Sequence, residues 1–221
     1  MIVVQPYHPT QLFPSLFFPT QSNLGSLFNR SSYLMQDIFR WLPFRTAINK
    51  WRQQDLNLPP LGINHIKDSH VLKIPTIYGF SPNFIPKPES WEKHIDITGY
   101  WFLDDLDWQP PQELVDFLEA GPSPVCISFS SMVADNPEKV ANIILQALAK
   151  TKQRGVFLTG WNNFDQIDWP DTVFKIKEAP HTWLFPRMAA VIHHGGAGTT
   201  GVSLKSGIPS IITPFFFDQP F

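Results

Sequence analysis

The sequence predicts an α/β protein whose second half is built around a parallel β-sheet. After residue 108, short apolar runs typical of buried strands alternate with segments of helical periodicity. Glycine or proline stands at the ends of most of these segments. A glycine-rich turn, HHGGAGTTG at 193–201, follows one apolar run, in the place where a parallel strand passes into a helix.

The first half has a less regular pattern. Many of the 22 prolines precede residue 112, so extended chain and turns are expected there. Residues 1–4 predict a short strand followed by a long loop. Residues 26–54 have apolar side chains at helical spacing, and Pro43 is expected to divide this segment into two helices. Residues 71–77 and 95–100 predict short strands.

The second half predicts alternating strands and helices, each ended by a recognisable signal. A helix over 110–119 has prolines at its start and Gly121 as its stop, and a second helix begins at Pro137. The last helix should end at Gly207. The other predicted elements are strands 124–129, 155–159, 173–176, 190–193 and 208–213 and a helix over 199–206.

Composition excludes several classes of protein. The 221 residues carry a formal net charge of −2, which does not suit a nucleic-acid-binding surface. The single cysteine, Cys126, excludes an internal disulfide and fits a reducing compartment. Four prolines interrupt the apolar N-terminus, so it predicts neither a signal peptide nor a membrane span. We therefore expect a soluble, cytoplasmic chain.

The turn at 193–201 has the physical properties of a phosphate site. The first N–H groups of a helix have no internal acceptor, and the helix dipole adds partial positive charge at that end. Glycines allow a phosphate to approach the backbone because no Cβ stands in the way. An imidazole beside the turn, from His193 or His194, could donate a further hydrogen bond, and its protonation would add charge.

The same residues allow other interpretations. Gly196, Gly198 and Gly201 satisfy the G-x-G-x-x-G fingerprint of dinucleotide-binding oxidoreductases, and Asp218 lies near the distance at which that fingerprint needs an acid. The turn comes late in the chain, however, and histidines separate it from its strand. His193, at the end of a strand, could equally be a satisfied core residue. Asp218 and Gln219 could cap a helix or hold adjacent sugar hydroxyls.

Several motifs together resemble a known family. They are PHTWLFPRMAAVIHHGGAGTT (180–200), GIP (207–209) and PFFFDQPF (214–221), preceded by IPKPESW (85–91), TGYWFLD (98–104), WQPP (108–111) and FLEAGPSPV (117–125). The C-terminal motifs resemble the donor-binding signature of GT-B glycosyltransferases in the UDP-glycosyltransferase superfamily. The most similar members are sterol 3-beta-glucosyltransferase-like enzymes and the antibiotic (macrolide and glycopeptide) glycosyltransferases.

The resemblance implies a fold and an activity. It implies two Rossmann-like domains with parallel sheets, both incomplete in this chain. Residues 1–98 would be the later part of the acceptor-binding domain, 99–111 the linker, and 112–221 the truncated donor-binding domain. The implied reaction is an inverting, metal-independent transfer of a hexose, glucose above all, from a UDP-sugar to a hydroxyl of a lipophilic acceptor such as a sterol. The UDP-sugar is a substrate, so no cofactor is implied.

The resemblance also assigns roles to individual residues. It implies that His193 and the backbone of the turn hold the diphosphate, that His181 reaches the nucleobase, and that Ser131 lies near the phosphates. Asp218 and Gln219 would hold the sugar hydroxyls. The turn residues are Gly195, Gly196, Ala197, Gly198 and Thr199. No metal, nucleic acid or partner protein is implied, and a peripheral membrane contact through the acceptor is compatible with this function.

The chain departs from the family pattern at three places. It has Ser128-Phe-Ser-Ser131 where the family usually has Gly-Phe-Gly-Ser, which adds side chains beside the expected phosphate site. The family's catalytic histidine precedes the region that matches Met1, and we assign no catalytic base. The chain also stops at Phe221, directly after the predicted sugar-binding residues. We therefore expect a fragment of a glycosyltransferase with little activity, or a non-catalytic nucleotide-binding remnant. The histidines without that catalytic context are His8, His65, His70 and His94.

Overall fold

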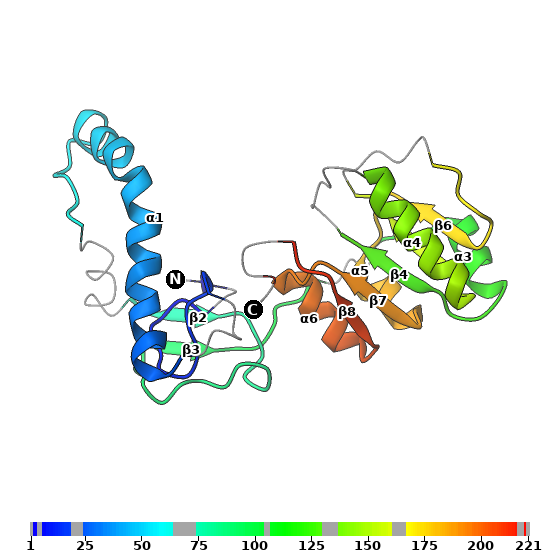
Figure 1. Cartoon of the computed structure of the whole chain (residues 1–221), viewed down its shortest axis with the longest axis horizontal. Coiled ribbons are helices and arrows are strands. Elements are labelled where there is room, and N and C mark those ends of the chain that lie inside the picture. Colours follow the sequence, from blue (N-terminus) through cyan, green and yellow to red (C-terminus); the bar gives the residue numbers. More distant parts are fainter. Residues whose placement is uncertain are drawn as a thin grey trace. The chain divides into compact units, whose positions relative to one another are not determined.

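The chain forms two compact units, each with its own parallel β-sheet (Figure 1). Unit 1 runs from Met1 to Trp101 and unit 2 from Phe102 to Gln219. The computed structural model describes residues 2–3, 6–18, 24–63, 74–103, 107–129, 137–160, 167–215 and 219.

The sheet of unit 1 joins strands that are far apart in the sequence. Its order is β1 (Ile2–Val3), β2 (Thr76–Tyr78) and β3 (Ile95–Ile97), all parallel. Strand β1 lies within the predicted strand 1–4, β3 is shorter than the predicted 95–100, and β2 overlaps the predicted 71–77 but ends one residue later. Residues 1, 4 and 71–73 lie outside the described part. Burial explains the position of β2 and β3, because Tyr78 and Ile95 pack in one apolar cluster with Phe80 and Trp91.

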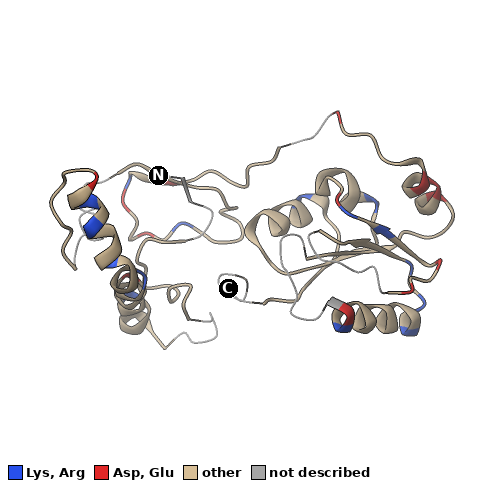
Figure 2. Ribbon diagram, turned by 90° about the horizontal axis from the view of Figure 1, so that it is seen from above, with Lys and Arg blue, Asp and Glu red and all other residues tan. Residues whose placement is uncertain are grey.

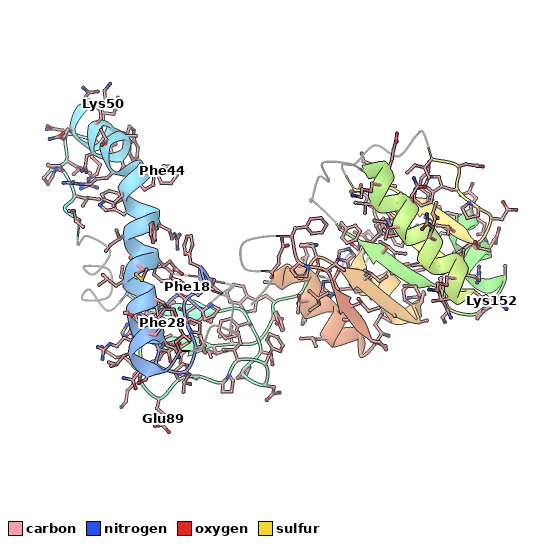
Figure 3. The ribbon with its side chains drawn as sticks, viewed as in Figure 1. Phe18, Phe28, Phe44, Lys50, Glu89 and Lys152 are labelled. Atoms are coloured by element: carbon pink, nitrogen blue, oxygen red, sulfur yellow. The ribbon has the colours of Figure 1, made fainter. Side chains whose placement is uncertain are left out.

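The segment 26–54 is one helix, α1 (Ser26–Gln54), and the predicted break at Pro43 is wrong. A proline inside a helix removes one backbone hydrogen bond. Contacts on either side of Pro43 hold the helix together: before it, Ser15 N–H donates to Ser32 Oγ at 2.7 Å, and after it, Asn49 Nδ2 donates to Leu61 O at 3.0 Å. The proline bends the helix instead. Figure 1 shows α1 changing direction near the position at which Figure 3 labels Phe44.

The buried side of α1 is unusually polar for a surface helix. Its buried side includes Asn29, Ser32 and Gln36, each at most 3% exposed. Large apolar side chains lie outside: Leu27 is 86% exposed and Phe39 61%. Buried polar groups require hydrogen-bond partners, and Asn29 Nδ2 donates to Gln11 O at 2.9 Å. Hydrogen bonds, together with the buried rings of Tyr33 and Trp41, thus attach this side of α1 to the rest of unit 1. None of the helices in the described part of the chain is long and apolar enough to cross a membrane.

Unit 2 contains a five-stranded parallel sheet among the described residues, in the order β6-β5-β4-β7-β8. Strands β6 and β7 have the predicted bounds, and the others are shorter than predicted by one to three residues. Ser128 at the end of β4 stands beside His193 at the end of β7. The strands are β4 (Val125–Ser128), β5 (Gly155–Leu158), β6 (Val173–Ile176), β7 (Ala190–His193) and β8 (Ser210–Ile212).

Helices cover both faces of this sheet, which confirms the predicted α/β class. On one face, Cys126 and Val191 pack with Leu114 of α3 and Leu184 of α5. On the other face, Ile127 and its neighbours pack with α4, which lies across the strands in Figure 1. The helices are α3 (Gln112–Glu119), α4 (Pro137–Thr151), α5 (His181–Leu184), the 3-10 helix η2 (Phe185–Arg187) and α6 (Ala197–Ser206).

The last helix begins earlier than predicted and ends where expected. Helix α6 starts at Ala197 rather than at residue 199, because Gly196 already serves as its N-cap. It ends at Gly207, whose φ of 68° lies in the left-handed region that glycine adopts without strain. The N-terminus of α6 therefore lies directly after the β7 strand and its histidines.

Candidate functional site

Two neighbouring parallel strands end side by side at the carboxyl edge of the unit 2 sheet. Ser128 ends β4 and His193 ends β7, and the two residues are register partners. Successive side chains of a strand point to opposite faces, so Ser128 shares a face with Cys126, and His193 shares a face with Val191. Both residues therefore lie on the face covered by α3 and α5. Both are completely buried. Open α/β sheets bind ligands beyond the carboxyl ends of their strands, which makes this edge the candidate site.

The turn after β7 requires two of its glycines for its own geometry. Gly195 has φ 92°, and a Cβ there would stand 2.8 Å from Ile212 Cγ2 and 3.2 Å from Gln219 O. Non-glycine residues rarely adopt this φ, and the neighbouring backbone leaves little space. At Gly196, a Cβ would overlap Nε2 of His194. These glycines allow the chain to turn from β7 directly into α6.

The N-terminus of α6 offers unpaired backbone donors. Thr200 N–H is bonded to Gly196 O at 2.9 Å, and the preceding N–H groups in the first turn have no acceptor within the helix. No side chain caps this end. The space beside Gly198 is open, because no heavy atom lies within 4 Å of the place where its Cβ would stand. Protein packing therefore does not require glycine at 198. Close approach of an anion to the backbone would require it, because a Cβ would stand in the way.

A hydrogen bond fixes the protonation of the His193 ring. Gly195 N–H donates to His193 Nδ1 at 3.1 Å, so Nδ1 is an acceptor and the proton of a neutral ring sits on Nε2. Burial, followed by the charges of His194 and His181, lowers the pKa of His193 to about 4. Nε2 is buried and has no hydrogen-bond partner among the described residues. His193 thus presents an unsatisfied neutral N–H rather than the positive charge considered from sequence.

His181 lies in the same cluster of polar groups. Its Nε2 is 3.2 Å from Ser128 Oγ, and its ring stacks on Phe185 with centroids 4.5 Å apart. Burial, and then the charge of His194, lowers the pKa of His181 to about 4. The three histidines therefore influence one another electrostatically. Even so, the described residues contain no group of three His, Cys, Asp or Glu side chains arranged to hold a metal ion.

The structure brings together only some of the residues predicted from sequence. His181, His193 and the turn from Gly195 to Thr199 lie around the carboxyl edge of β4 and β7. Gln219 also lies beside the turn, where its Oε1 accepts a hydrogen bond from Phe215 N–H at 2.8 Å. This bond occupies the carboxamide oxygen that was expected to meet a sugar hydroxyl. Ser131 and Asp218 lie outside the described residues, so their roles stay predictions.

Sequence reasoning gave no role to two residues that the structure places in this site. Ser128 was treated only as a replacement for glycine, yet it contacts His181. His194 was considered but not chosen, yet it lies against Gly196 and affects the pKa values of both other histidines. Ser128 could have been found by alternation, because residues 126 and 128 share one face of a strand. No comparable pattern marks His194.

Comparisons with known proteins agree with this geometry. Residues 155–221 match the family described as Erythromycin biosynthesis protein CIII-like, C-terminal domain. The chain is 41% identical over 218 residues to a sterol 3-beta-glucosyltransferase of Arabidopsis thaliana, a match that covers 98% of this chain and 34% of that protein. It is 37% identical to a sterol 3-beta-glucosyltransferase of Leptosphaeria maculans, covering 98% of this chain and 16% of that protein.

A solved structure shows the same fold. The glycotransferase of kitacinnamycin superposes with a TM-score of 0.61 at 18% identity, over 86% of this chain and 48% of that chain. The chain spans about a third or less of the length of the two curated relatives named above. Over nearly its whole length the chain is thus sterol 3-beta-glucosyltransferase-like, and its parallel-sheet architecture matches part of a GT-B glycosyltransferase fold.

Proposed function

We propose that this chain forms the sugar-nucleotide site of an enzyme that transfers glucose from UDP-glucose to the hydroxyl of a sterol or a similar lipophilic alcohol. The names of the relatives at 41% and 37% identity support this substrate pair. The observation that carries the proposal is the buried Nε2–H of His193, which lacks a partner among the described residues beside the open N-terminus of α6. A buried unsatisfied donor costs about 1–3 kcal/mol, and a diphosphate oxygen would remove that cost.

In this proposal, unit 2 stabilises the departing UDP. The acceptor oxygen attacks the anomeric carbon while the bond from that carbon to the diphosphate oxygen breaks. The first N–H groups of α6 and the helix dipole stabilise the negative charge that develops on the diphosphate. His193 adds one hydrogen bond from Nε2. We further propose that His181 faces the nucleobase, Ser131 the phosphates, and Asp218 with Gln219 the sugar hydroxyls.

The base that takes the acceptor proton is left unassigned. His8 Nδ1 is 2.6 Å from Tyr78 Oη, and two backbone N–H groups also donate to that oxygen. The Tyr78 hydroxyl therefore donates to His8, which gives this histidine a structural task in unit 1. His65 and His70 lie outside the described residues.

Calorimetric titration of the full chain with UDP-glucose, UDP and NADH tests the donor site. UDP and UDP-glucose should bind, and NADH should not. His193→Asn keeps an acceptor for Gly195 N–H but loses Nε2–H, so the affinity for UDP should fall about tenfold. Tighter binding of NADH would instead support the dinucleotide site at Gly196, Gly198 and Gly201.

Turnover tests the transfer itself. Labelled UDP-glucose and a sterol are incubated with the full chain, and the labelled sterol glucoside is measured. Binding of UDP without turnover would identify a nucleotide-binding remnant. Turnover that survives His193→Asn unchanged would remove His193 from the proposed mechanism.

A further inference from the structure

Two polar side chains of unit 2 are paired inside the candidate site: Ser128, at the end of β4, and His181, at the start of α5. Ser128 Oγ lies 3.2 Å from His181 Nε2. Ser128 is completely buried, whereas the His181 side chain is partly exposed. The two residues are 53 positions apart in the sequence, so this contact is made by the fold and not by a local turn. Its effect on His181 depends on which of the two groups donates the hydrogen bond.

The buried hydroxyl of Ser128 sets the direction of this hydrogen bond. Among the described residues, His181 Nε2 is the one group that is hydrogen-bonded to Ser128 Oγ. A hydroxyl has one hydrogen to donate, and a buried donor that lacks an acceptor is costly. Donation from Ser128 O–H to His181 Nε2 avoids this cost, whereas the opposite direction would leave the hydroxyl hydrogen without an acceptor in the described part of the chain. Because Nε2 is the acceptor, the proton of the neutral ring sits on Nδ1.

The proton of His181 is not fixed by a carboxylate of the described residues. The pKa of this histidine is lowered by burial and by the charge of His194, and no described carboxylate raises it. Figure 2 shows red Asp and Glu positions on α3 and charged positions at the two ends of α4, whereas α5 itself carries no Lys, Arg, Asp or Glu. The ring also stacks on Phe185. Ser128 therefore fixes the proton of the ring, and Phe185 fixes its plane.

The candidate site then contains two neutral imidazole donors. His193 presents Nε2–H, because Gly195 N–H occupies its Nδ1. His181 presents Nδ1–H, because Ser128 O–H occupies its Nε2, and Nδ1 has no hydrogen-bond partner among the described residues. A ligand atom that meets either ring nitrogen must therefore be a hydrogen-bond acceptor.

We propose that Ser128 is a positioning residue that fixes His181 as a hydrogen-bond donor, and that this donor selects a nucleobase with a carbonyl acceptor. The inference rests on the proposed function, in which His181 faces the nucleobase. Uracil, like thymine, has a carbonyl acceptor at position 4, whereas cytosine has an amino donor at the same place. A fixed N–H at His181 favours UDP over CDP, because the amino group of cytosine would face another donor.

Nitrogen-15 NMR of the full chain, labelled at its 7 histidines, tests the effect of Ser128 on the ring. The shifts of the ring nitrogens distinguish protonated from unprotonated atoms, and the signals lost in His181→Gln assign the ring. In the unchanged protein at neutral pH, His181 should carry its proton on Nδ1. In Ser128→Ala, no hydroxyl remains at Nε2, so the ring should populate both tautomers. A proton on Nε2 in the unchanged protein would overturn the proposal. This measurement needs no ligand, so its result is independent of UDP binding.

Calorimetric titration of the full chain with UDP and CDP tests the selection. The unchanged protein should bind UDP more tightly than CDP. In Ser128→Ala, part of the molecules present an acceptor at Nδ1, so the affinity for UDP should fall and the affinity for CDP should rise. The ratio of the two affinities should fall roughly tenfold. General damage to the site would lower both affinities instead. Equal affinities of the unchanged protein for UDP and CDP would overturn the selection, and absence of binding by both nucleotides would overturn the proposed function as well.

A matched control removes a buried hydroxyl elsewhere in unit 2. Ser203, in the second half of α6, is also a buried serine, and its hydroxyl contacts that of Ser210. Ser203→Ala should keep the ratio of UDP to CDP affinity of the unchanged protein. Ser128→Cys keeps a weak donor at the original place, so it should retain part of the preference for UDP. An equal loss of preference in Ser203→Ala and Ser128→Ala would contradict a specific role of Ser128.

A double-mutant cycle shows whether Ser128 acts through His181. In the His181→Gln background, Ser128→Ala should leave the ratio of UDP to CDP affinity unchanged, because the ring that Ser128 positions is no longer present. A change as large as that in the original background would mean that Ser128 affects the nucleotide independently of His181, which would overturn its positioning role.

Discussion

At the scale of single residues, the buried ring of His193 links the candidate site to the stability of unit 2. Its pKa is lowered to about 4, and an exposed histidine titrates near 6.5. Between these values the unfolded chain takes up a proton that the folded chain does not. The stabilisation associated with the neutral ring is therefore complete above pH 6.5 and is lost as the pH falls toward 4.

This linkage predicts a difference between the protein and its His193→Asn variant. Urea unfolding at pH 7 and pH 4.5 should show a smaller loss of unfolding free energy in the variant, by on the order of 2 kcal/mol. Asparagine is suitable because it does not titrate and still accepts from Gly195 N–H. Equal losses in both proteins would mean that His193 is already protonated in the folded state at pH 4.5.

Two glycines of one turn predict opposite results on substitution. Gly195→Ala places a Cβ against Ile212 and Gln219 at a φ of 92°, so unit 2 should lose about 1–3 kcal/mol of stability. Gly198→Ala meets no neighbouring atom and stands in a helix, so stability should be unchanged or slightly higher. UDP should nevertheless bind Gly198→Ala more weakly. Thermal unfolding and UDP titration of both variants check the pair, and unchanged UDP binding by Gly198→Ala would exclude close contact with the ligand.

At the scale of elements, α1 tolerates a proline because contacts from other segments hold both of its halves. Pro43→Ala restores a backbone donor at an exposed position and should stabilise unit 1 by up to about 3 kcal/mol. Circular dichroism should then show a higher melting temperature for the helical signal. An unchanged melting temperature would mean that the missing N–H of Pro43 does not weaken α1.

The elements also show where local sequence is sufficient. Strands β6 and β7 were predicted at their observed bounds, because each is a short apolar run between clear stop signals. The continuity of α1 was not predictable, because it depends on bonds to residues 10–30 positions away, such as those of Ser32 and Trp41. The strand that pairs with β1 was also not predictable from local sequence, because Ile2 pairs with Ile77, far along the chain. Pairing between distant segments leaves no local signal.

At the scale of the whole molecule, the two units differ in how far sequence defines them. The repeated strand–helix pattern of unit 2 predicted its class and the position of the glycine-rich turn at 193–201. The cluster formed by Ser128, His181 and His194 became visible only when the sheet register placed β4 beside β7. In unit 1, the apolar side chains of α1 were interpreted from sequence as helical periodicity. The structure shows that these side chains divide between the two sides, since Tyr33 and Trp41 are buried whereas Leu27, Leu34 and Leu42 are exposed.

The single cysteine, Cys126, gives unit 2 an experimental signal of its own. Cys126 is completely buried in β4, and burial raises the pKa of its thiol, so alkylating reagents should react only after unit 2 opens. Opening of unit 1 exposes no thiol, so it does not change the rate of alkylation. The labelling rate of Cys126 should therefore fall by the factor 1 + [L]/Kd when UDP binds. The native thiol thus reports ligand binding to unit 2 without any label being added to the chain.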